Sequence, residues 1–389
     1  MRVTHVITRL IVGGAQENTI ASVLGLRKKP GLEINLLSGP SVGPEGSLES
    51  SLERSALSVV PELVRPIHPW KDVLAFQRLT RIFRQHPPDI VHTHSGKAGI
   101  LGRLAAGRAA VPIIVHTVHG PSFGPFQGAA ANSIFKAAER RAGKVTSHFV
   151  VVADSMKEQY LAAGIGTPDI YTKILSGFDL APFLSTTNDL GLRAKFGISP
   201  NEFVVGKIAR LFKLKGHDDL LAIAPLLARE FPRIKFLLVG DGKWRGQLEA
   251  KATELGLKDR FVFTGLVEPK AVAGLIGIMD MVVHLSRREG LPRSLPQALA
   301  ATRPVVAYDC DGAKEVCIDA ETGFLVRPGD LDTLKNRLLQ LANSPALREK
   351  LGKSGREFVK ERFGVDRMLN DLYQLYLRLA KDRGIVRPA

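Results

Sequence analysis

Residues 285–300 read LSRREGLPRSLPQALA, and this stretch joins a buried strand to a helix. The apolar run before it, residues 279–285, contains two adjacent valines and predicts a buried strand. Leucine and alanine then recur at helical spacing from residue 294 to residue 301, so residues 289–293 form a strand-to-helix turn. One of the two prolines can occupy the first helical turn, where a missing N–H costs nothing.

This turn combines features of an anion site with a carboxylate. Unpaired N–H groups and the positive end of a helix dipole favour an anion such as phosphate above the turn. Glu289 lies within the turn, and a carboxylate accepts hydrogen bonds from sugar hydroxyls although it repels phosphate. The turn therefore suits a ligand that has both a phosphate part and a sugar part.

The spacing of polar residues around the turn resembles a family signature. An acid, seven residues and a second acid form the EX7E pattern of the large retaining glycosyltransferase family 4, which has the GT-B fold. Here the first acid is Glu289, and Gln297 stands at the second position. In the family the second acid binds both ribose hydroxyls. Glutamine keeps one acceptor oxygen without the charge, which weakens donor binding by roughly 1–2 kcal/mol.

Length and composition are those of a globular protein. The chain has 389 residues, 45% of them hydrophobic and 24% charged, which is enough for two α/β domains. Cys310 and Cys317 have no partners at zinc spacing, so we expect thiols in a reducing compartment and no metal site. The sequence shows neither a signal core nor an apolar run of the ~18 residues that span a bilayer. These features predict a cytoplasmic protein.

The net charge of +16 favours anionic binding partners. No RNA- or DNA-binding signature accompanies the charge, so we expect no nucleic-acid partner. Phosphorylated ligands and an anionic membrane surface fit better, and a basic surface that only keeps the protein soluble is the alternative. Basic, apolar segments at residues 78–84 and 136–144 add the hypothesis of peripheral binding at the inner membrane face.

Strands and helices alternate through both halves of the chain, which predicts α/β structure with two Rossmann-like, doubly wound parallel sheets. Strands are expected at residues 3–8, 33–38, 89–93, 113–118, 148–153, 170–175, 203–208, 234–239, 260–264, 281–285 and 304–308. Helices are expected between them, including one near residues 48–55, and in a tail at residues 331–341, 346–362 and 365–382.

A polar stretch interrupts this alternation at residues 183–200 and is expected to be a linker. The N-terminal domain, residues 1–182, would then bind the acceptor, and the C-terminal domain, residues 201–364, would bind a nucleotide sugar. With the family resemblance this implies the GT-B layout, in which the two domains face a cleft and a C-terminal helix, residues 365–389, packs back on the first domain.

Basic residues follow the first strand of the second half. Arg210 and Lys215 lie in a turn that opens a helix, so both can reach one diphosphate. The turn resembles the family's GRLxxxKG element, which implies Arg210 and Lys215 as phosphate ligands, while Lys213 between them is expected to be solvated. The alternative is a basic surface turn. The turn lies at the expected switch point of the second sheet, where ligands bind in such folds, and this argues against a mere surface turn.

Other elements follow in family order at the ends of strands. Gly240 and Asp241 resemble a VGDG turn that lines the nucleotide pocket, although an ordinary Asp-Gly turn is the alternative. Main-chain atoms near Val267 would contact the base, and Arg293 could supply charge that Gln297 lacks. The residues expected to bind the donor are Gly14, Arg210, Lys215, Gly240, Asp241, Val267, Glu289, Gly290, Leu291, Arg293, Ser294 and Gln297.

Glycine and histidine residues end strands of the first half. Gly14 lies in a turn that resembles the family's GGA(E/Q) loop, with an ordinary βα turn as the alternative. His119 is expected to contact the donor sugar, as the matching histidine does in the family, whereas His116 is expected to be structural. Ser95 and Lys97 are candidates for an acceptor-side rim, although a structural role is favoured.

The resemblance implies a retaining, metal-independent hexosyl- or N-acetylhexosaminyltransferase that needs no cofactor. Arg210 and Lys215 would stabilise the charge that develops on the departing diphosphate, with Glu289 and His119 completing the catalytic set. The expected donor is a UDP-sugar rather than a GDP-sugar. The expected acceptor is a lipid-linked or soluble sugar in cell-surface polysaccharide or glycolipid synthesis. A sugar-nucleotide epimerase and a non-catalytic sugar-nucleotide sensor are alternatives on the same fold.

Overall fold

The computed structural model describes residues 1–41, 46–53, 55–94, 96–124 and 126–385. The chain forms two compact units. The first contains Met1–Gly177 and the segment from Val365 onward, and the second is Phe178–Gly364. Each unit has its own sheet and its own core. Within the described ranges, no helix has both the length and the apolar character needed to cross a bilayer.

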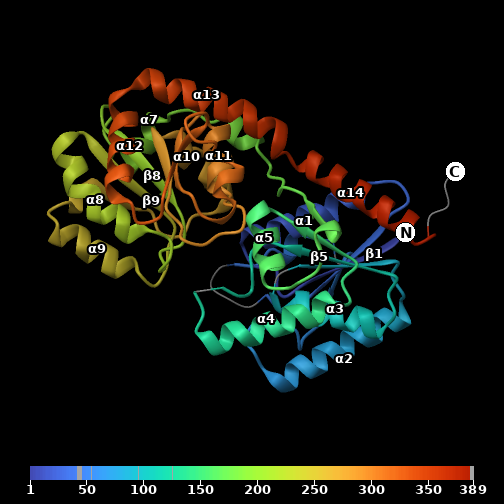
Figure 1. The fold of residues 1–389 in the computed structure, drawn as a ribbon. Coiled ribbons are helices and arrows are strands. Elements are labelled where there is room, and N and C mark those ends of the chain that lie inside the picture. Colours follow the sequence, from blue (N-terminus) through green and yellow to red (C-terminus); the bar gives the residue numbers. More distant parts are fainter. Residues whose placement is uncertain (42–45, 54, 95, 125, 386–389) are drawn as a thin grey trace. The chain divides into compact units, whose positions relative to one another are not determined.

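Parallel strands form the sheet of the first unit in the order β3-β2-β1-β4-β5-β6-β7 (Figure 1). The chain order reverses between β1 and β4, so this pair is the switch point of a doubly wound sheet. The strands are β1 (Arg2–Ile7), β2 (Glu33–Ser38), β3 (Leu57–Val59), β4 (Ile90–His94), β5 (Ile113–Val118), β6 (His148–Val151) and β7 (Tyr171–Lys173).

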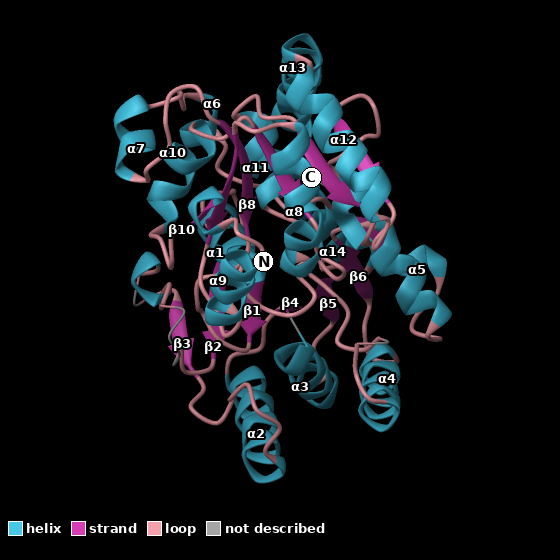
Figure 2. Ribbon diagram, turned by 90° about the vertical axis from the view of Figure 1, so that its left-hand side faces the viewer, coloured by secondary structure: helices cyan, strands magenta, loops and turns pink. Residues whose placement is uncertain are grey.

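Helices cover both faces of this sheet. One row of neighbouring helices comprises α2, α3 and α4, and α1 packs against α14 (Figures 1 and 2). Successive strand residues point to opposite faces, so Val3 and Ile7 join the α1–α14 core while Val6 joins the core under α2 and α3. The helices are α1 (Gly14–Leu26), α2 (Pro69–Gln85), α3 (Gly96–Arg108), α4 (Ala129–Gly143), α5 (Asp154–Ala162) and α14 (Val365–Asp382).

The last helix belongs to the first unit because of its apolar face. Met368, Leu372 and Tyr376 recur at helical spacing and are buried in the core shared with α1. Asn18 of α1 donates a hydrogen bond to the sulfur of Met368 over 2.9 Å. The first unit therefore consists of two segments of the sequence, which lie before and after the second unit.

The second unit has a parallel sheet with the order β10-β9-β8-β11-β12-β13, and its order reverses between β8 and β11. Its strands are β8 (Phe203–Ile208), β9 (Ile234–Val239), β10 (Phe261–Phe263), β11 (Met281–His284), β12 (Val305–Tyr308) and β13 (Gly323–Val326). Its helices are α6 (Ala181–Leu184), α7 (Leu190–Lys195), α8 (His217–Glu230), α9 (Arg245–Glu254), α10 (Val272–Gly277), α11 (Ser294–Ala300), α12 (Leu331–Asn343) and α13 (Pro345–Arg362). The predicted pair of Rossmann-like sheets is confirmed.

The stretch expected as a linker, residues 183–200, is part of the second unit instead. It contains α7 and the second half of α6, and the boundary falls between Gly177 and Phe178. Arg193 explains the difference, because its buried guanidinium donates to Asp280 Oδ2 over 3.1 Å and to several main-chain carbonyls. Polar residues in this stretch therefore form hydrogen bonds within the second unit and do not mark an exposed linker.

Two short strands, β3 and β13, were not expected from the sequence. Leu57–Val59 is only partly buried, so it lacks the apolar run of an inner strand. The strand Gly323–Val326 begins with a glycine whose added Cβ would lie 2.3 Å from the Val305 carbonyl oxygen. The helix expected near residues 48–55 is reduced to the 3-10 turn Glu49–Ser51.

Candidate functional site

The loops that follow β8 and β11 meet at the switch point of the second sheet. Gly216 has a φ of 66°, and a Cβ there would lie 2.1 Å from the carbonyl oxygen of Leu285 at the end of β11. The Arg287 N–H also donates to the Leu214 carbonyl over 2.8 Å. These contacts bring the predicted phosphate-binding turn, residues 210–216, against the turn that carries Glu289.

Lys215 and Glu289 form an ion pair where these loops meet. The ammonium of Lys215 donates to Glu289 Oε1, and the hydroxyl of Ser286 donates to the same oxygen over 3.0 Å. The two charged side chains are only 18% and 25% exposed. The structure therefore brings together two of the residues that the sequence assigned to the donor site.

Main-chain bonds hold the Glu289 turn from its other side. The Glu289 N–H donates to Asp311 Oδ2 over 2.8 Å, and the Gly290 carbonyl accepts from the Gly312 N–H over 3.0 Å. The segment after β12 thus fixes the backbone of the turn while Lys215 and Ser286 fix the carboxylate.

Glu289 is charged although it is largely buried. Burial raises the pKa of this carboxyl, but Lys215, His284 and the hydrogen bonds from Lys215 and Ser286 outweigh that effect and lower the pKa below 4.5. His284 lies beneath it with Nε2 3.8 Å from Glu289 Oε1, and burial lowers its pKa to about 3, so it is neutral. His284 Nδ1 is hydrogen bonded to the hydroxyl of Ser294 over 3.1 Å.

Lys207 adds a cation that the sequence analysis did not identify. It lies on β8 and is 1% exposed. Its pKa is lowered to about 7, because burial and the nearby charge of Lys215 outweigh the opposing effect of Glu289 and two aspartates. Lys207 is therefore only partly charged near neutral pH, and it interacts electrostatically with the Lys215–Glu289 pair. The sequence feature that could have identified Lys207 is its position as the one charged residue in the apolar run of residues 203–208.

Arg210 lies on the outer side of the same loop. Its side chain is exposed, and its guanidinium lies over the ring of Phe212, 5.2 Å from the centroid. Among the described residues, this guanidinium has no hydrogen-bond partner. Arg210 can therefore bind an anion without breaking an existing bond. Lys213 is also exposed, as expected.

The predicted Gly240–Asp241 turn packs against the Arg210 loop. Gly240 has a φ of 133°, and a Cβ there would lie 2.3 Å from the Ala209 carbonyl oxygen. The Leu211 N–H donates to the Asp241 carbonyl over 2.9 Å. The Asp241 carboxylate accepts from Gly242 N over 2.7 Å and from Arg245 over 3.2 Å, so it stabilises its own turn and the start of α9.

The remaining predicted donor residues lie around this centre to different degrees. Gln297 on α11 is 7% exposed, and its side-chain amide has no hydrogen bond within the described part of the chain. Leu291 is half-buried in the turn, and the Arg293 guanidinium lies 6.0 Å from the ring centroid of Phe178. Val267 follows β10, which lies two strands away from β8 in the sheet.

In the first unit, the predicted residue His119 lies at the end of a buried histidine cluster. His119 is half-buried, and its Nε2 is hydrogen bonded to His94 Nδ1 over 3.1 Å. Burial lowers the pKa of His119 to about 4, so the ring is neutral at pH 7. His116 is buried on the other face of the sheet, with Nδ1 2.9 Å from Thr93 Oγ1 and its ring against Gly99. The structure thus gives the two histidines separate surroundings.

His5, His92 and His94 are the group in the described ranges with nitrogen atoms close enough to hold a metal ion, all within 4.8 Å of one another. Each of their ring nitrogens is, however, hydrogen bonded to a protein group. The sequence analysis did not identify this cluster. The signal that could have found it is the alternation in VHTH at residues 91–94, which places His92 and His94 on one face.

The other candidates of the first unit differ in their surroundings. Gly14 is exposed at the first residue of α1. Lys97 is committed to neighbouring groups, because its ammonium donates to Asp72 over 2.5 Å and to the Pro66 carbonyl. That arrangement favours the structural role for Lys97. Ser95 lies outside the described residues.

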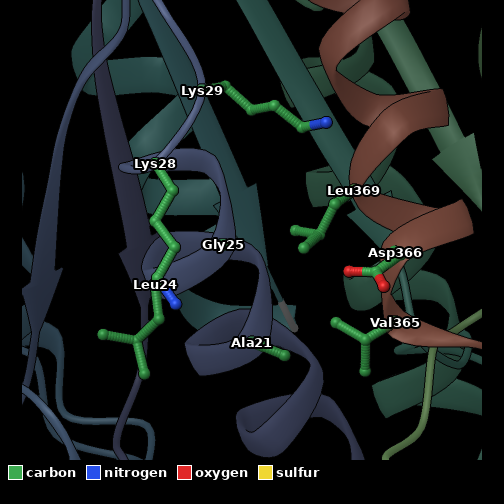
Figure 3. A pocket seen from close by; sticks show the side chains of 8 residues that line it. All are labelled: Ala21, Leu24, Gly25, Lys28, Lys29, Val365, Asp366 and Leu369. Atoms are coloured by element: carbon green, nitrogen blue, oxygen red, sulfur yellow. The ribbon is translucent and has the colours of Figure 1, made fainter.

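An open pocket lies between α1 and the start of α14, and its lining is shown in Figure 3. Lys28 and Lys29 follow the C-terminal end of α1, at the opposite end of the helix from Gly14. Since α1 has 13 residues, about 20 Å separates its two ends. This pocket is therefore separate from the strand ends that carry the candidate site residues.

Both halves of the chain match family descriptions. Residues 12–174 match "Glycosyltransferase Family 4", and residues 191–358 match "Glycosyl transferases group 1". Among curated proteins, an Escherichia coli UDP-Gal:alpha-D-GlcNAc-diphosphoundecaprenol alpha-1,3-galactosyltransferase is 27% identical, with 98% of each chain covered. A Staphylococcus aureus capsular polysaccharide biosynthesis glycosyltransferase, CapM, is 23% identical, with 92% of each chain covered.

Solved structures share the fold over nearly the whole chain. HepE of Anabaena in complex with UDP-glucose has a TM-score of 0.80 at 22% identity, covering 97% of this chain and 100% of that chain. The sucrose-phosphate synthase of Thermosynechococcus elongatus has a TM-score of 0.79 at 20% identity, with 98% and 100% covered. At these identities the likeness shows the fold alone.

The close packing at Gly216 predicts an effect of substitution that goes beyond backbone conformation. Gly216→Ala should disrupt the loop, because the new Cβ would meet the Leu285 carbonyl at 2.1 Å in addition to the positive φ. Gly256→Ala is the matched control, since Gly256 has a φ of 69° but no atom within 4 Å of the added Cβ. We expect a cost of about 1–2 kcal/mol at Gly256 and a larger loss at Gly216. Urea unfolding measures both, and equal losses would contradict the packing argument.

Lys207 predicts a pH dependence of the stability of the second unit. Its folded pKa of about 7 is below the ordinary 10.5, so the unfolded chain binds more protons between these values. Stability should therefore rise with pH there, by up to about 1.4 kcal/mol per unit. Lys207→Met should remove this part of the slope between pH 7.5 and 8.5.

The measurement uses urea unfolding followed through Trp244 fluorescence in a Trp70→Phe background, so that the signal reports the second unit. Lys213→Met is the control, because Lys213 is exposed. Parallel pH profiles for wild type and Lys207→Met would show that Lys207 is not titrating in this range.

Proposed function

This chain belongs to glycosyltransferase family 4 and has the GT-B fold, and from that premise we propose that it is a retaining, metal-independent enzyme that uses a UDP-sugar. The observation that carries the proposal is the Lys215–Glu289 pair at the switch point between β8 and β11, with Arg210 exposed in the same loop as Lys215. In doubly wound sheets, ligands bind outside the carboxyl ends of strands at such a point.

The charges at this point suit a sugar diphosphate. Arg210 can bind phosphate oxygens with parallel hydrogen bonds, and Lys215 can act as a point charge. Lys207 interacts electrostatically with Lys215 and can take up a proton when negative charge arrives, because its pKa of about 7 is close to ambient pH. These groups supply positive charge for the leaving diphosphate in a site that needs no divalent ion.

Glu289 competes with phosphate for Lys215 before a donor binds. The Lys215 ammonium is bonded to the carboxylate, and Arg210 has no hydrogen-bond partner among the described residues. A diphosphate would therefore meet Arg210 first and then draw Lys215 from Glu289. The carboxylate so released could accept hydrogen bonds from sugar hydroxyls, in line with the two-part ligand that the turn suits.

The uridine base is supported by similar proteins rather than by a side chain of this site. Solved structures of the same fold hold UDP, UDP with glucose, and UDP-glucose. The galactosyltransferase relative is named for a UDP-sugar donor and for a diphosphoundecaprenol-linked acceptor. A UDP-sugar donor and a lipid-linked sugar acceptor in polysaccharide or glycolipid synthesis are the corresponding proposals for this chain.

Exposed apolar side chains on the first unit favour a lipid-linked acceptor over a soluble one. Ile67 and Trp70, before and at the start of α2, are 69% and 71% exposed, and Ile134 on α4 is 66% exposed. The helices that carry them belong to the row formed by α2, α3 and α4 (Figure 2). Basic residues of the segments 78–84 and 136–144 lie on the same two helices. Aromatic and basic side chains together are typical of a membrane-surface contact.

Arg210→Ala tests the donor site. Loss of a charge-assisted bond of about 1.5–3 kcal/mol predicts a fall of roughly 10- to 100-fold in kcat/KM for the preferred sugar nucleotide. Lys213→Ala is the matched control, since it removes a neighbouring exposed cation, and should change kcat/KM less than about threefold. A panel of UDP-, GDP- and ADP-sugars is assayed with and without EDTA, and the anomeric configuration of the product is read by NMR.

Several results would contradict this proposal. Equal activities of Arg210→Ala and Lys213→Ala would remove Arg210 from the site. An inverted anomeric centre would overturn the retaining mechanism, and activity abolished by EDTA would overturn metal independence. Conversion of the donor sugar without any acceptor would identify an epimerase.

Flotation with liposomes tests the membrane contact. The full chain should bind vesicles that contain anionic lipid. Trp70→Ala combined with Ile67→Ala should weaken binding at least tenfold, because burying one large apolar side chain contributes about 1.5–3 kcal/mol. Leu266→Ala is the control, since Leu266 is equally exposed but lies on the second unit. Equal binding by both variants, or none at low salt, would contradict a membrane contact at α2.

A further inference from the structure

A continuous chain of buried polar side chains lies behind His119 in the first unit. His5 on β1 is in register with His92 on β4, and His94 is in register with Thr117 on β5. Strand alternation places these four side chains on the face of the sheet that α14 covers. Tyr376 of α14 is fully buried against them.

The first links run from β5 through α14 to β1. Thr117 Oγ1 lies 2.6 Å from His92 Nε2, and His92 Nδ1 lies 2.5 Å from the Tyr376 hydroxyl. The same hydroxyl lies 3.3 Å from His5 Nε2. The tyrosine therefore joins two histidines that lie on neighbouring strands.

The remaining links lead from β1 to the candidate site. His5 Nδ1 lies 2.9 Å from His94 Nε2, and His94 Nδ1 lies 3.1 Å from His119 Nε2. In this way each ring uses one nitrogen for the preceding group and the other nitrogen for the next. The result is an unbranched chain of hydrogen bonds from Thr117 to His119.

Every imidazole in this chain of hydrogen bonds is neutral at pH 7. Burial lowers the pKa of His5 to about 3 and that of His119 to about 4, and it lowers the pKa of His92 and His94 well below 6.5. A neutral imidazole has one N–H and one lone pair. The direction of donation must therefore be the same at every link, and one end of the chain fixes it for the other end.

Thr117 fixes that direction. Thr117 is 4% exposed, and among the described residues the one hydrogen-bond partner of its hydroxyl is His92 Nε2. If His92 donated to Thr117, the hydroxyl proton would have no protein acceptor, at a cost of about 1–3 kcal/mol. The neighbouring cavity of about 10 Å³ is at the lower limit for the water that could accept it. Donation therefore runs from Thr117 to His119.

We infer that Thr117, His92, Tyr376, His5 and His94 are positioning residues that hold His119 in the tautomer with its proton on Nδ1. With Nε2 accepting from His94, Nδ1 is the nitrogen that can donate to a substrate. His119 then acts as a neutral hydrogen-bond donor to an oxygen of the sugar, and it does not act as a general base through this nitrogen. The role in sugar transfer rests on the proposed function, whereas the tautomer itself does not.

The contacts of the histidine cluster fit a chain of hydrogen bonds better than they fit a metal site. A metal ion binds the lone pairs of neutral imidazoles. Each ring nitrogen of His5, His92 and His94 already has a protein partner, so a metal bound by all three would break at least two of the hydrogen bonds. Metal binding is therefore an outcome that would overturn the assignment.

Nitrogen NMR of the full chain labelled with ¹⁵N-histidine tests the tautomer without any assay of activity. The ring signals of His119 are assigned by their loss in His119→Asn. We expect an N–H type shift for Nδ1 and a lone-pair type shift for Nε2 in the wild type. The reverse pattern would overturn the inferred direction of donation.

Tyr376→Phe keeps the buried ring and removes the hydroxyl that joins His92 to His5. We expect the Nδ1–H form of His119 to fall from nearly all of the population to about half, so the two nitrogen shifts move toward each other. Tyr373→Phe is the matched control on the same helix, because its hydroxyl donates to the Pro30 carbonyl outside the chain. Unchanged shifts in Tyr376→Phe would remove the tyrosine from the chain, and Thr117→Val repeats the test from the other end if Tyr376→Phe does not fold.

A double-mutant cycle tests the link to catalysis. The amide N–H of asparagine can take the place of Nδ1–H, so in a His119→Asn background the tautomer no longer matters. Tyr376→Phe should therefore lower kcat about twofold when His119 is present and leave kcat unchanged in the His119→Asn background. An equal loss in both backgrounds would show a merely structural role.

Zinc titration completes the set of outcomes. If Zn²⁺ added alone shifts the signals of His5, His92 and His94 at stoichiometric concentration, the cluster is a metal site and the positioning role is overturned. If the NMR results hold but no sugar nucleotide is turned over, the tautomer stands and the proposed function fails instead.

Discussion

The candidate site depends on one ion pair, in which Lys215 at the end of the β8 loop holds the carboxylate of Glu289 after β11. Either charge alone would be costly at this degree of burial, and removing one partner leaves the other uncompensated. The pair is possible because β8 and β11 are neighbours at the point where strand order reverses. Gly216 permits the close approach of the two loops, since a side chain there would collide with the Leu285 carbonyl. The strand order, the glycine at position 216 and the ion pair thus all determine how closely the loops after β8 and β11 approach each other.

The two units bury their polar groups in different ways. In the second unit, Lys207, Lys215 and Glu289 are placed within reach of one another, so the protonation of each affects the others. In the first unit, the histidines are kept neutral by burial, and hydrogen bonds rather than charges order them. Charge suits the binding of a diphosphate, whereas a neutral donor suits an uncharged hydroxyl. The two units therefore offer different chemistry, a charged centre in the second and a neutral hydrogen-bonded cluster in the first.

Sequence reasoning identified the fold and the charged centre because both depend on local patterns. The inner strands β2, β5, β8 and β9 have the predicted bounds, since each is an apolar run between turn residues. The edge strands β3 and β13 lack such runs, and residues 183–200 looked like a linker because the buried role of Arg193 depends on Asp280, far along the chain. The same limit applies to the histidine chain. Alternation places His92 and His94 on one face, but nothing local indicates that Tyr376 comes to lie against His92 from 284 residues away.

The glutamine at position 297 changes the charge of the proposed site as well as its hydrogen bonding. Relative to the two-acid pattern of the family, the site has one negative charge fewer, while Arg210, Lys215 and the partly charged Lys207 remain. A second carboxylate on α11 would attract ribose hydroxyls but would also repel the diphosphate, by about 1–4 kcal/mol at close range. The bond lost at the ribose is therefore offset in part by reduced repulsion at the phosphates. Since the Gln297 amide has no partner among the described residues, it is available to the ribose without the loss of an existing bond, so glutamine at this position is compatible with a functional donor site.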